Sequence, residues 1–480
     1  MRILKNSLTR FGGLLFIAFL MAGCTSPGGE TSGFDIVLSG GRVIDPDSGL
    51  DAVRNVGIRD GKIIAVSEET LEGERIIDVA GLVVAPGFID LHAHGQTDQA
   101  FELMVRDGVT SALELEVGAG DIAAWYAERE DGKLLNYGAS VGHIPVRMKV
   151  MGDEGLFLPS GPAGSEVASD SQVAEMKALL EKGLEDGSVG VGFGMAYTPS
   201  ASPDEFETMM RVAADHGAPA FIHVKSGLSG LREAIATAKK AGAALHVVHA
   251  NSSGGAETGR FLAIIQEARD GGQDVTTEAY PYEAGMTSIQ SALFDDWQSW
   301  DDERIEKHQW PLTGEWLTRE SFARYRESGG NVIIHSRTEE MTRTAIENPL
   351  VMIASDGFIV DGKGHPRTSG TYSKVLGKYV RELGALKLTD ALAKMTIQPA
   401  KRLENYVPMM RNKGRIRAGA DADIAVFDAD EIIDQATYAE PTLASKGLPF
   451  VLVNGVLVVE NGALVEGVKP GRAIQGKGRK

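Results

Sequence analysis

The stretch Ala85-Pro-Gly-Phe-Ile-Asp-Leu-His-Ala-His-Gly95 joins a turn, a short apolar strand and two histidines. The Pro-Gly pair predicts a turn, and the apolar residues after it predict a strand. Because side chains alternate along a strand, His92 and His94 should project from the same face. Two imidazoles placed in this way can bind one metal ion, although the His-x-His pattern alone is weak. Stronger support has to come from other strand ends in the chain.

Strand-like and helix-like segments alternate between residues 85 and 413, which is typical of a parallel α/β fold. The apolar runs predict eight barrel strands, at 88–94, 109–116, 135–143, 188–194, 219–224, 244–250, 274–279 and 350–356. A further run at 331–335 is a spare candidate for a barrel strand. Helices are expected at 170–186, 203–216, 230–241 and 258–270. Eight strands in a segment of this length predict a (β/α)8 TIM barrel.

Residues 293–326 interrupt this alternation. They carry four of the five tryptophans of the chain, Trp297, Trp300, Trp310 and Trp316. Long loops of such barrels tend to serve the face at the carboxyl ends of the strands. We therefore expect this insertion to be a lid over the barrel mouth, the alternative being an element that packs against the barrel's side.

The two chain ends that flank the barrel alternate short apolar runs with turns. Residues 34–84 contain the hairpin signal Asp60-Gly61, and residues 414–465 contain a similar signal, Asn454-Gly455. Neither segment has enough strands to bury a hydrophobic core by itself. We therefore expect one small β-sandwich domain that is built from both segments.

The composition is that of a globular protein with an acidic surface. The 480 residues are 43% hydrophobic and 24% charged, which gives room for a large domain and a smaller one. The net charge of −18 argues against nucleic-acid binding, which needs a basic face. It also requires that an anionic substrate meet local positive groups or a metal.

The start of the chain predicts export. A positively charged beginning and a short apolar run at 11–22 are typical of a signal peptide, and the run is too short to span a membrane comfortably. It ends in Leu20-Met-Ala-Gly-Cys24, which is similar to a bacterial lipobox and contains the only cysteine. We expect residues 1–23 to be a signal peptide and Cys24 to be lipidated, with 24–33 as a flexible tether. This predicts a membrane-anchored lipoprotein that faces the periplasm or the cell surface.

Several of the predicted barrel strands end in imidazole or carboxylate side chains. In a barrel the carboxyl ends of all strands meet at one mouth, so residues far apart in the sequence converge there. Such ligands suit Zn²⁺ or a similar divalent ion. The candidate metal ligands are His92, His94, Glu116, His223 and His249, with Glu114 as the second choice for the glutamate. Asp356 ends the last predicted strand at the same mouth.

The chain resembles the amidohydrolase superfamily and, within it, the N-acyl-D-amino-acid deacylase (D-aminoacylase) family. The resemblance covers about residues 34–465 and implies metal-ligand roles for the four histidines and a catalytic role for Asp356. It also implies a divalent metal cofactor, expected to be Zn²⁺, as one or two ions. The stretches that carry it are Asn136-Tyr-Gly-Ala-Ser-Val-Gly-His143, Gly190-Val-Gly-Phe-Gly-Met-Ala-Tyr-Thr-Pro199, Glu278-Ala-Tyr-Pro-Tyr-Glu-Ala-Gly285, Ser355-Asp-Gly357 and His365-Pro-Arg-Thr-Ser-Gly-Thr-Tyr-Ser-Lys-Val-Leu-Gly-Lys-Tyr-Val-Arg381.

Two departures from the family pattern concern the metal and the substrate. The family's metal-ligating cysteine is absent here, so Glu116 or Glu114 would replace a soft thiolate by a hard oxygen and shift the metal preference away from tight zinc binding. We expect Glu116 to bridge or bind the metal with His223 and His249, while His92 and His94 complete a second, weaker site. The family's lysine two residues after the last of these histidines is Asn251 here, which removes one positive contact to a substrate carboxylate.

The predicted activity is metal-dependent hydrolysis of the amide bond of N-acyl-D-amino acids, small-molecule substrates. Asp356 is expected to take a proton from water and pass it to the leaving nitrogen. The alternatives are a cyclic amidase of the hydantoinase or dihydroorotase kind, a dipeptidase, or a binding lipoprotein without catalysis. The cyclic amidases usually carry a carbamylated lysine at a strand end, and the nearest candidate, Lys149, is poorly placed.

Arg367 is expected to hold the substrate's α-carboxylate, because a guanidinium matches a carboxylate in a bidentate geometry. Lys225, Tyr280 and Tyr282 are the expected helpers. His143 and Tyr197 are expected to stabilise the oxygen of the reacting carbonyl.

Overall fold

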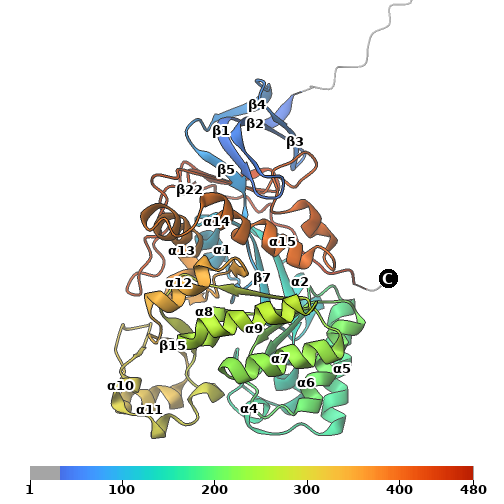
Figure 1. The fold of residues 1–480 in the computed structure, drawn as a ribbon, viewed down its shortest axis with the longest axis vertical. Helices are drawn as coiled ribbons and strands as arrows, with labels where there is room; N and C mark the ends of the chain where they lie inside the picture. The colour runs from blue at the N-terminus through green and yellow to red at the C-terminus, as the bar shows by residue number, and fades with distance from the viewer. Residues whose placement is uncertain (1–32, 479–480) are drawn as a thin grey trace, which may run out of the picture. The chain divides into compact units, whose positions relative to one another are not determined.

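The computed structural model describes residues 33–478 (Figure 1). The predicted signal peptide and Cys24 lie outside the described residues. Within them, no helix is both long enough and apolar enough to cross a membrane.

The largest part of the chain is an eight-stranded parallel sheet in the order β16-β12-β11-β10-β9-β8-β7-β6. Its two outer strands are joined by a parallel bridge between Ala93 and Gly357, and the His94 N–H donates to the Gly357 carbonyl at 2.9 Å. The sheet therefore closes into the predicted (β/α)8 barrel. Its strands are β6 (Phe88–Asp90), β7 (Val109–Ala119), β8 (Asn136–Gly142), β9 (Val191–Gly194), β10 (Ala220–His223), β11 (Leu245–Val247), β12 (Val275–Ala279) and β16 (Val351–Ile353).

Helices pack around the barrel, and the four that the sequence predicted are α5 (Asp170–Glu185), α6 (Pro203–Asp215), α7 (Gly227–Ala241) and α9 (Thr258–Asp270) (Figure 1). Local sequence explains where they begin. Ser169 and Gln172 form a capping box before α5, and the Ser202 hydroxyl accepts from the Glu205 N–H before α6. The other helices are α1 (Asp98–Val105), α2 (Ile122–Ala127), α3 (His143–Met151), α4 (Pro162–Ser165), α8 (Ala250–Gly254), α12 (Glu339–Glu347), α13 (Arg367–Lys374), α14 (Leu388–Met395) and α15 (Ile397–Leu403).

Strands from both chain ends form a second, nine-stranded sheet. They are β1 (Phe34–Asp45), β2 (Leu50–Arg59), β3 (Lys62–Ser67), β4 (Gly73–Asp78), β5 (Val83–Pro86), β19 (Ile424–Phe427), β20 (Phe450–Val453), β21 (Val456–Glu460) and β22 (Ala463–Leu464). β5 pairs with β1 on one side and with β19 on the other, so both chain ends share one ladder. One hydrophobic core unites them through residues such as Val43, Val84, Ile424 and Leu452. Neither chain end has to bury a core alone.

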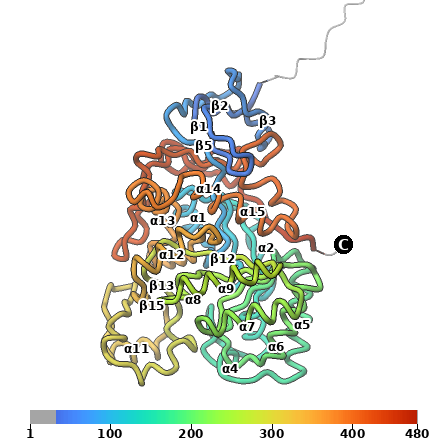
Figure 2. Tube along the Cα trace, viewed as in Figure 1, coloured from blue at the N-terminus to red at the C-terminus, as the bar shows by residue number. Residues whose placement is uncertain are grey.

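The chain leaves the barrel after β12 and returns through α12 (Figure 2). Between them lies an insertion subdomain, residues 285–335, with a three-stranded sheet and its own core around Trp300 and Phe322. Its elements are β13 (Gly285–Ser288), α10 (Asp302–Ile305), β14 (His308–Gln309), α11 (Arg319–Ser328) and β15 (Asn331–Ile334). The insertion is thus wider than the predicted 293–326. The predicted spare strand at 331–335 belongs to it, because β15 pairs antiparallel with β13 and β14 rather than with the barrel.

Candidate metal centre and active site

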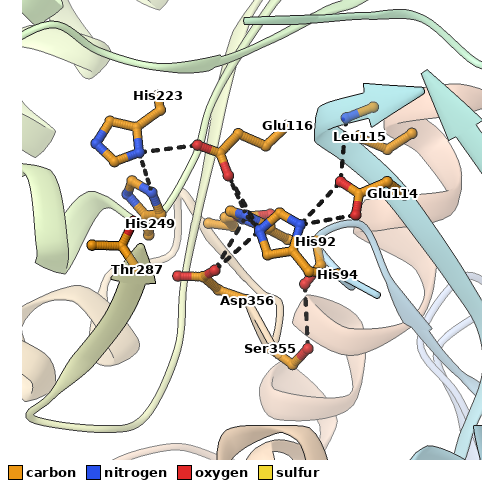
Figure 3. A network of polar contacts seen from close by, with 12 residues as sticks. His92, His94, Glu114, Leu115, Glu116, His223, His249, Thr287, Ser355 and Asp356 are labelled. Carbon is orange, nitrogen blue, oxygen red and sulfur yellow. Dashed lines mark hydrogen bonds and ion pairs between the residues drawn. The ribbon is translucent and has the colours of Figure 1, made fainter. Parts of the chain in front are cut away.

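Three side chains from the two barrel strands that meet at the closure form a first ligand group. His92 and His94 follow β6, and Asp356 follows β16 (Figure 3). The Nε2 atoms of the two histidines lie 2.9 Å apart. Asp356 Oδ1 lies 3.5 Å from His92 Nε2 and 3.3 Å from His94 Nε2. One ligand atom from each residue therefore faces a common point, as a metal ion requires.

A second ligand group, Glu116, His223 and His249, lies beside the first. Glu116 Oε1 is 3.0 Å from His223 Nδ1, and His249 Nε2 is 3.1 Å from the same nitrogen. The other oxygen, Glu116 Oε2, is 2.9 Å from His92 Nε2 and 3.2 Å from His94 Nε2. Glu116 thus presents one oxygen to each group, the arrangement expected of a carboxylate that bridges two metal positions.

Glu114, the second choice for the glutamate ligand, lies behind His94. Its carboxylate oxygens are 2.9 and 3.0 Å from His94 Nδ1, on the side of the ring that faces away from the ligand groups. Glu114 therefore orients His94, and the geometry favours Glu116 over Glu114 as the candidate metal ligand.

Glu278, at the end of β12, supports His92 in the same way. Its Oε1 is 2.5 Å from His92 Nδ1, and its Oε2 is 3.1 Å from His246 Nε2. Burial by itself raises the pKa of Glu278, but the charges of His92 and His246 and their hydrogen bonds outweigh it and hold the pKa at about 2. This residue was missed by sequence reasoning, although it ends a predicted barrel strand and carries the same signal as the other candidates.

Asp356 connects the two histidines of the first ligand group to Arg367. Its Oδ2 is 2.8 Å from Arg367 Nη1, while its Oδ1 faces the two histidines. Burial opposes ionisation of this carboxyl, yet Arg367 and the histidines keep its pKa below the ordinary value. Asp356 and His249 both have positive φ angles, 51° and 35°, which non-glycine residues rarely adopt. Such strain at strand ends is typical of functional positions.

The two ligand groups open into a cavity of about 440 Å³ at the barrel mouth. The insertion subdomain supplies one wall of the cavity, with apolar side chains such as Leu293, Phe294, Trp300 and Ile334 beside polar ones such as His308. Three predicted substrate-binding residues, Arg367, Tyr280 and Tyr197, also line it. Tyr197 packs edge-on against His223 at 4.8 Å between ring centres. Burial and the Glu116 carboxylate raise the pKa of its hydroxyl well above the ordinary value, so the hydroxyl stays protonated.

The structure places the other three predicted substrate-binding residues outside this cavity. Lys225 is exposed and donates to the Pro199 carbonyl at 2.8 Å, because the chain has already turned outward towards α7. Tyr282 is buried, and its hydroxyl donates to Asp434. His143 is buried at the start of α3 and contacts Glu205 at 2.8 Å. Lys149, the residue considered for a cyclic amidase, lies in the last turn of α3 and does not line the cavity either.

A parallel (β/α)8 barrel whose mouth gathers four imidazoles and two carboxylates defines a metal-binding barrel enzyme. The donor set fits a divalent ion, since each of His92 and His94 also has a carboxylate behind its other nitrogen. The chain belongs to the amidohydrolase family, whose model matches residues 75–459. It is accordingly a hydrolase that acts on carbon–nitrogen amide bonds.

Similar proteins support the same assignment. An N-acyl-D-glutamate deacylase and a D-aminoacylase, both from Alcaligenes xylosoxydans xylosoxydans, are 31% and 28% identical to this chain. The matches cover 88% and 93% of this chain and 93% and 98% of the relatives. The crystal structure of an N-acyl-D-glutamate deacylase from Bordetella bronchiseptica, complexed with zinc and a phosphonate inhibitor, superposes with a TM-score of 0.79. The two sequences are 26% identical, and the superposition covers 92% of this chain and 100% of the other chain. Dihydroorotases and hydantoinases are more distant, at 27% and 18% identity.

Proposed function

We propose that this protein hydrolyses the amide bond of N-acyl-D-amino acids. The observation that carries the proposal is the position of Asp356 in the cavity, with one oxygen facing His92 and His94 and the other paired with Arg367. The likeness to N-acyl-D-amino-acid deacylases over nearly the whole chain supports the choice of substrate.

We propose Zn²⁺, as one or two ions, for the cofactor. His92, His94 and Asp356 would hold one ion, His223 and His249 the other, and Glu116 would contact both. When bound, such an ion polarises the substrate carbonyl and lowers the pKa of water. The glutamate in place of the family's cysteine makes the ligand set harder, which favours other divalent ions beside zinc.

The side chains of the cavity then divide the remaining work. Asp356 accepts a proton from the attacking water and delivers it to the leaving nitrogen, while Arg367 keeps the carboxylate ionised and oriented. The Tyr197 hydroxyl, which remains protonated, donates to the developing oxyanion. Arg367 and Tyr280, whose ring lies 4.5 Å from the guanidinium carbon, orient the substrate's α-carboxylate.

The test is turnover of paired N-acetyl-D- and N-acetyl-L-amino acids by the purified protein, together with its metal content. We expect D-isomers to be hydrolysed faster and activity to disappear on chelation. Dihydroorotate, a hydantoin and dipeptides should be poor substrates. Faster hydrolysis of L-isomers or of the cyclic amides would overturn the proposal.

We also propose that the protein is exported and anchored to a membrane by a lipid on Cys24. The lipobox-like sequence around this sole cysteine supports it. Metabolic labelling with a palmitate analogue should mark the wild type and not Cys24→Ala. Labelling that persists in the variant would refute the anchor.

A further inference from the structure

The cavity of this acidic protein is lined by four cationic side chains, Arg304, Lys307, Arg337 and Arg367. Two of them are exposed and already satisfied. Arg304 stacks on the Trp300 ring at 3.5 Å, and Lys307 pairs with Glu303 at 3.1 Å. Arg367 pairs with Asp356, and the proposed function already assigns it the α-carboxylate of the substrate. Arg337 is therefore the cation whose charge needs an explanation.

Arg337 follows β15, at the junction between the insertion subdomain and the barrel. Its Nη1 donates to the Ser252 hydroxyl at 3.0 Å, but its Nε and Nη2 are buried without a hydrogen-bond partner. No ion pair to this guanidinium occurs among residues 33–478. The residue as a whole is half-buried. A charge that is partly withdrawn from water without a counter-ion is costly, and buried nitrogens without a partner are rare in folded proteins. A ligand with a negative charge would remove that cost.

The surroundings of Arg337 define where such a ligand would lie. Its guanidinium carbon is 5.3 Å from the centre of the Tyr280 ring, and that of Arg367 is 4.5 Å from the same point. The two arginines therefore lie within about 10 Å of each other, around one tyrosine. A side chain at Gly285 would clash with Arg337 Nη2, since its Cβ would lie only 2.8 Å away. The glycine thus leaves room for the guanidinium.

We propose that Arg337 binds a second carboxylate of the substrate, the side-chain carboxylate of an acidic D-amino acid. The α-carboxylate then lies with Arg367 and Tyr280, on the Asp356 side of the cavity. Arg337 approaches from the His249 side, because its partner Ser252 lies in α8, directly after that histidine. The inference rests on the proposed function and adds the class of side chain that the site prefers.

The test compares N-acetyl-D-glutamate with its neutral isostere N-acetyl-D-glutamine. We expect the wild type to prefer the glutamate in kcat/KM and Arg337→Met to lose that preference by roughly 10- to 100-fold, the value of one charge-assisted hydrogen bond. Arg337→Lys should restore part of it. The loss should appear mainly in KM and shrink at high salt, which a purely structural role would not produce.

Arg326→Met is the matched control. Arg326 supports the same insertion subdomain through the Ile289 and Ser291 carbonyls and Asp295 but does not line the cavity. This variant should keep the glutamate preference of the wild type. An equal loss in this control, or an unchanged ratio in Arg337→Met, would overturn the assignment of Arg337.

Binding of glutarate, a dicarboxylate without an amide bond, separates this inference from the proposed function. Calorimetry should show at least about tenfold weaker binding of glutarate to Arg337→Met than to the wild type. If no N-acyl-D-amino acid is hydrolysed but this difference is found, the proposed function fails while the anion site stands. Equal binding to both proteins would overturn the anion site itself.

Discussion

The two ligand groups share Glu116 but are held in place by different partners. In the first group, Glu278 and Glu114 contact the rear nitrogens of His92 and His94, and Arg367 pairs with Asp356. In the second group, the rear contact of His249 is the Ser253 hydroxyl at 3.1 Å, and His223 is partly exposed. A carboxylate behind an imidazole fixes the ring and makes it more basic than a hydroxyl does. The first group is therefore the more rigid of the two, and it also holds Asp356, the proposed proton acceptor.

The largest effect should come from removing the proton acceptor of the first group. Asp356→Asn keeps an oxygen near the histidines but cannot accept a proton, so kcat should fall by about 10²–10⁴. Metal content, measured by mass spectrometry of the purified protein, should remain close to that of the wild type. Asp434→Asn is the control, because Asp434 contacts Tyr282 and does not line the cavity, and this variant should keep the kcat of the wild type. Near-normal turnover in Asp356→Asn would remove this residue from the mechanism.

The next effect concerns the residue that the two groups share. Glu116→Ala removes one oxygen from each group and should abolish most metal binding. Glu114→Ala removes only the partner of His94 and should lower the metal affinity about 10- to 100-fold. Titration with metal, followed by calorimetry, measures both affinities. The reverse order would make Glu114 the metal ligand.

A smaller effect should separate the partners behind the histidines. Glu278→Gln keeps the shape of the side chain but loses its charge, so metal affinity should fall by about 10- to 100-fold. Ser253→Ala removes only a hydroxyl from His249 and should change the affinity less. Equal losses in the two variants would mean that the two groups do not differ in the way the contacts indicate.

The smallest effect is expected on stability. A ligand that is present at 100 times its dissociation constant stabilises the folded state by about 2.7 kcal/mol, so chelation should lower Tm by a few degrees. The same treatment should leave Tm unchanged in Glu116→Ala. A drop of equal size in that variant would show that the chelator acts elsewhere than on the two ligand groups.

The sequence by itself predicted the barrel and the residues that its mouth brings together. Alternation along a strand placed His92 and His94 on one face, and the geometry of a parallel barrel made the strand ends that carry Glu116, His223 and Asp356 converge. Both rules are local, because they depend on the period of a strand and on where it ends. The structure gathers these side chains as expected, and their roles as ligands and base await the experiments above.

Tertiary structure alone decided which side chain meets which. The contact of His92 with Glu278 joins residues 186 positions apart, and that of Arg337 with Ser252 joins residues 85 positions apart. Lys225 and Tyr282 lie near the site in sequence, yet they turn away from the cavity. A periodic pattern specifies the face on which a side chain lies. Its partner is set by the packing of distant segments, which no local pattern encodes.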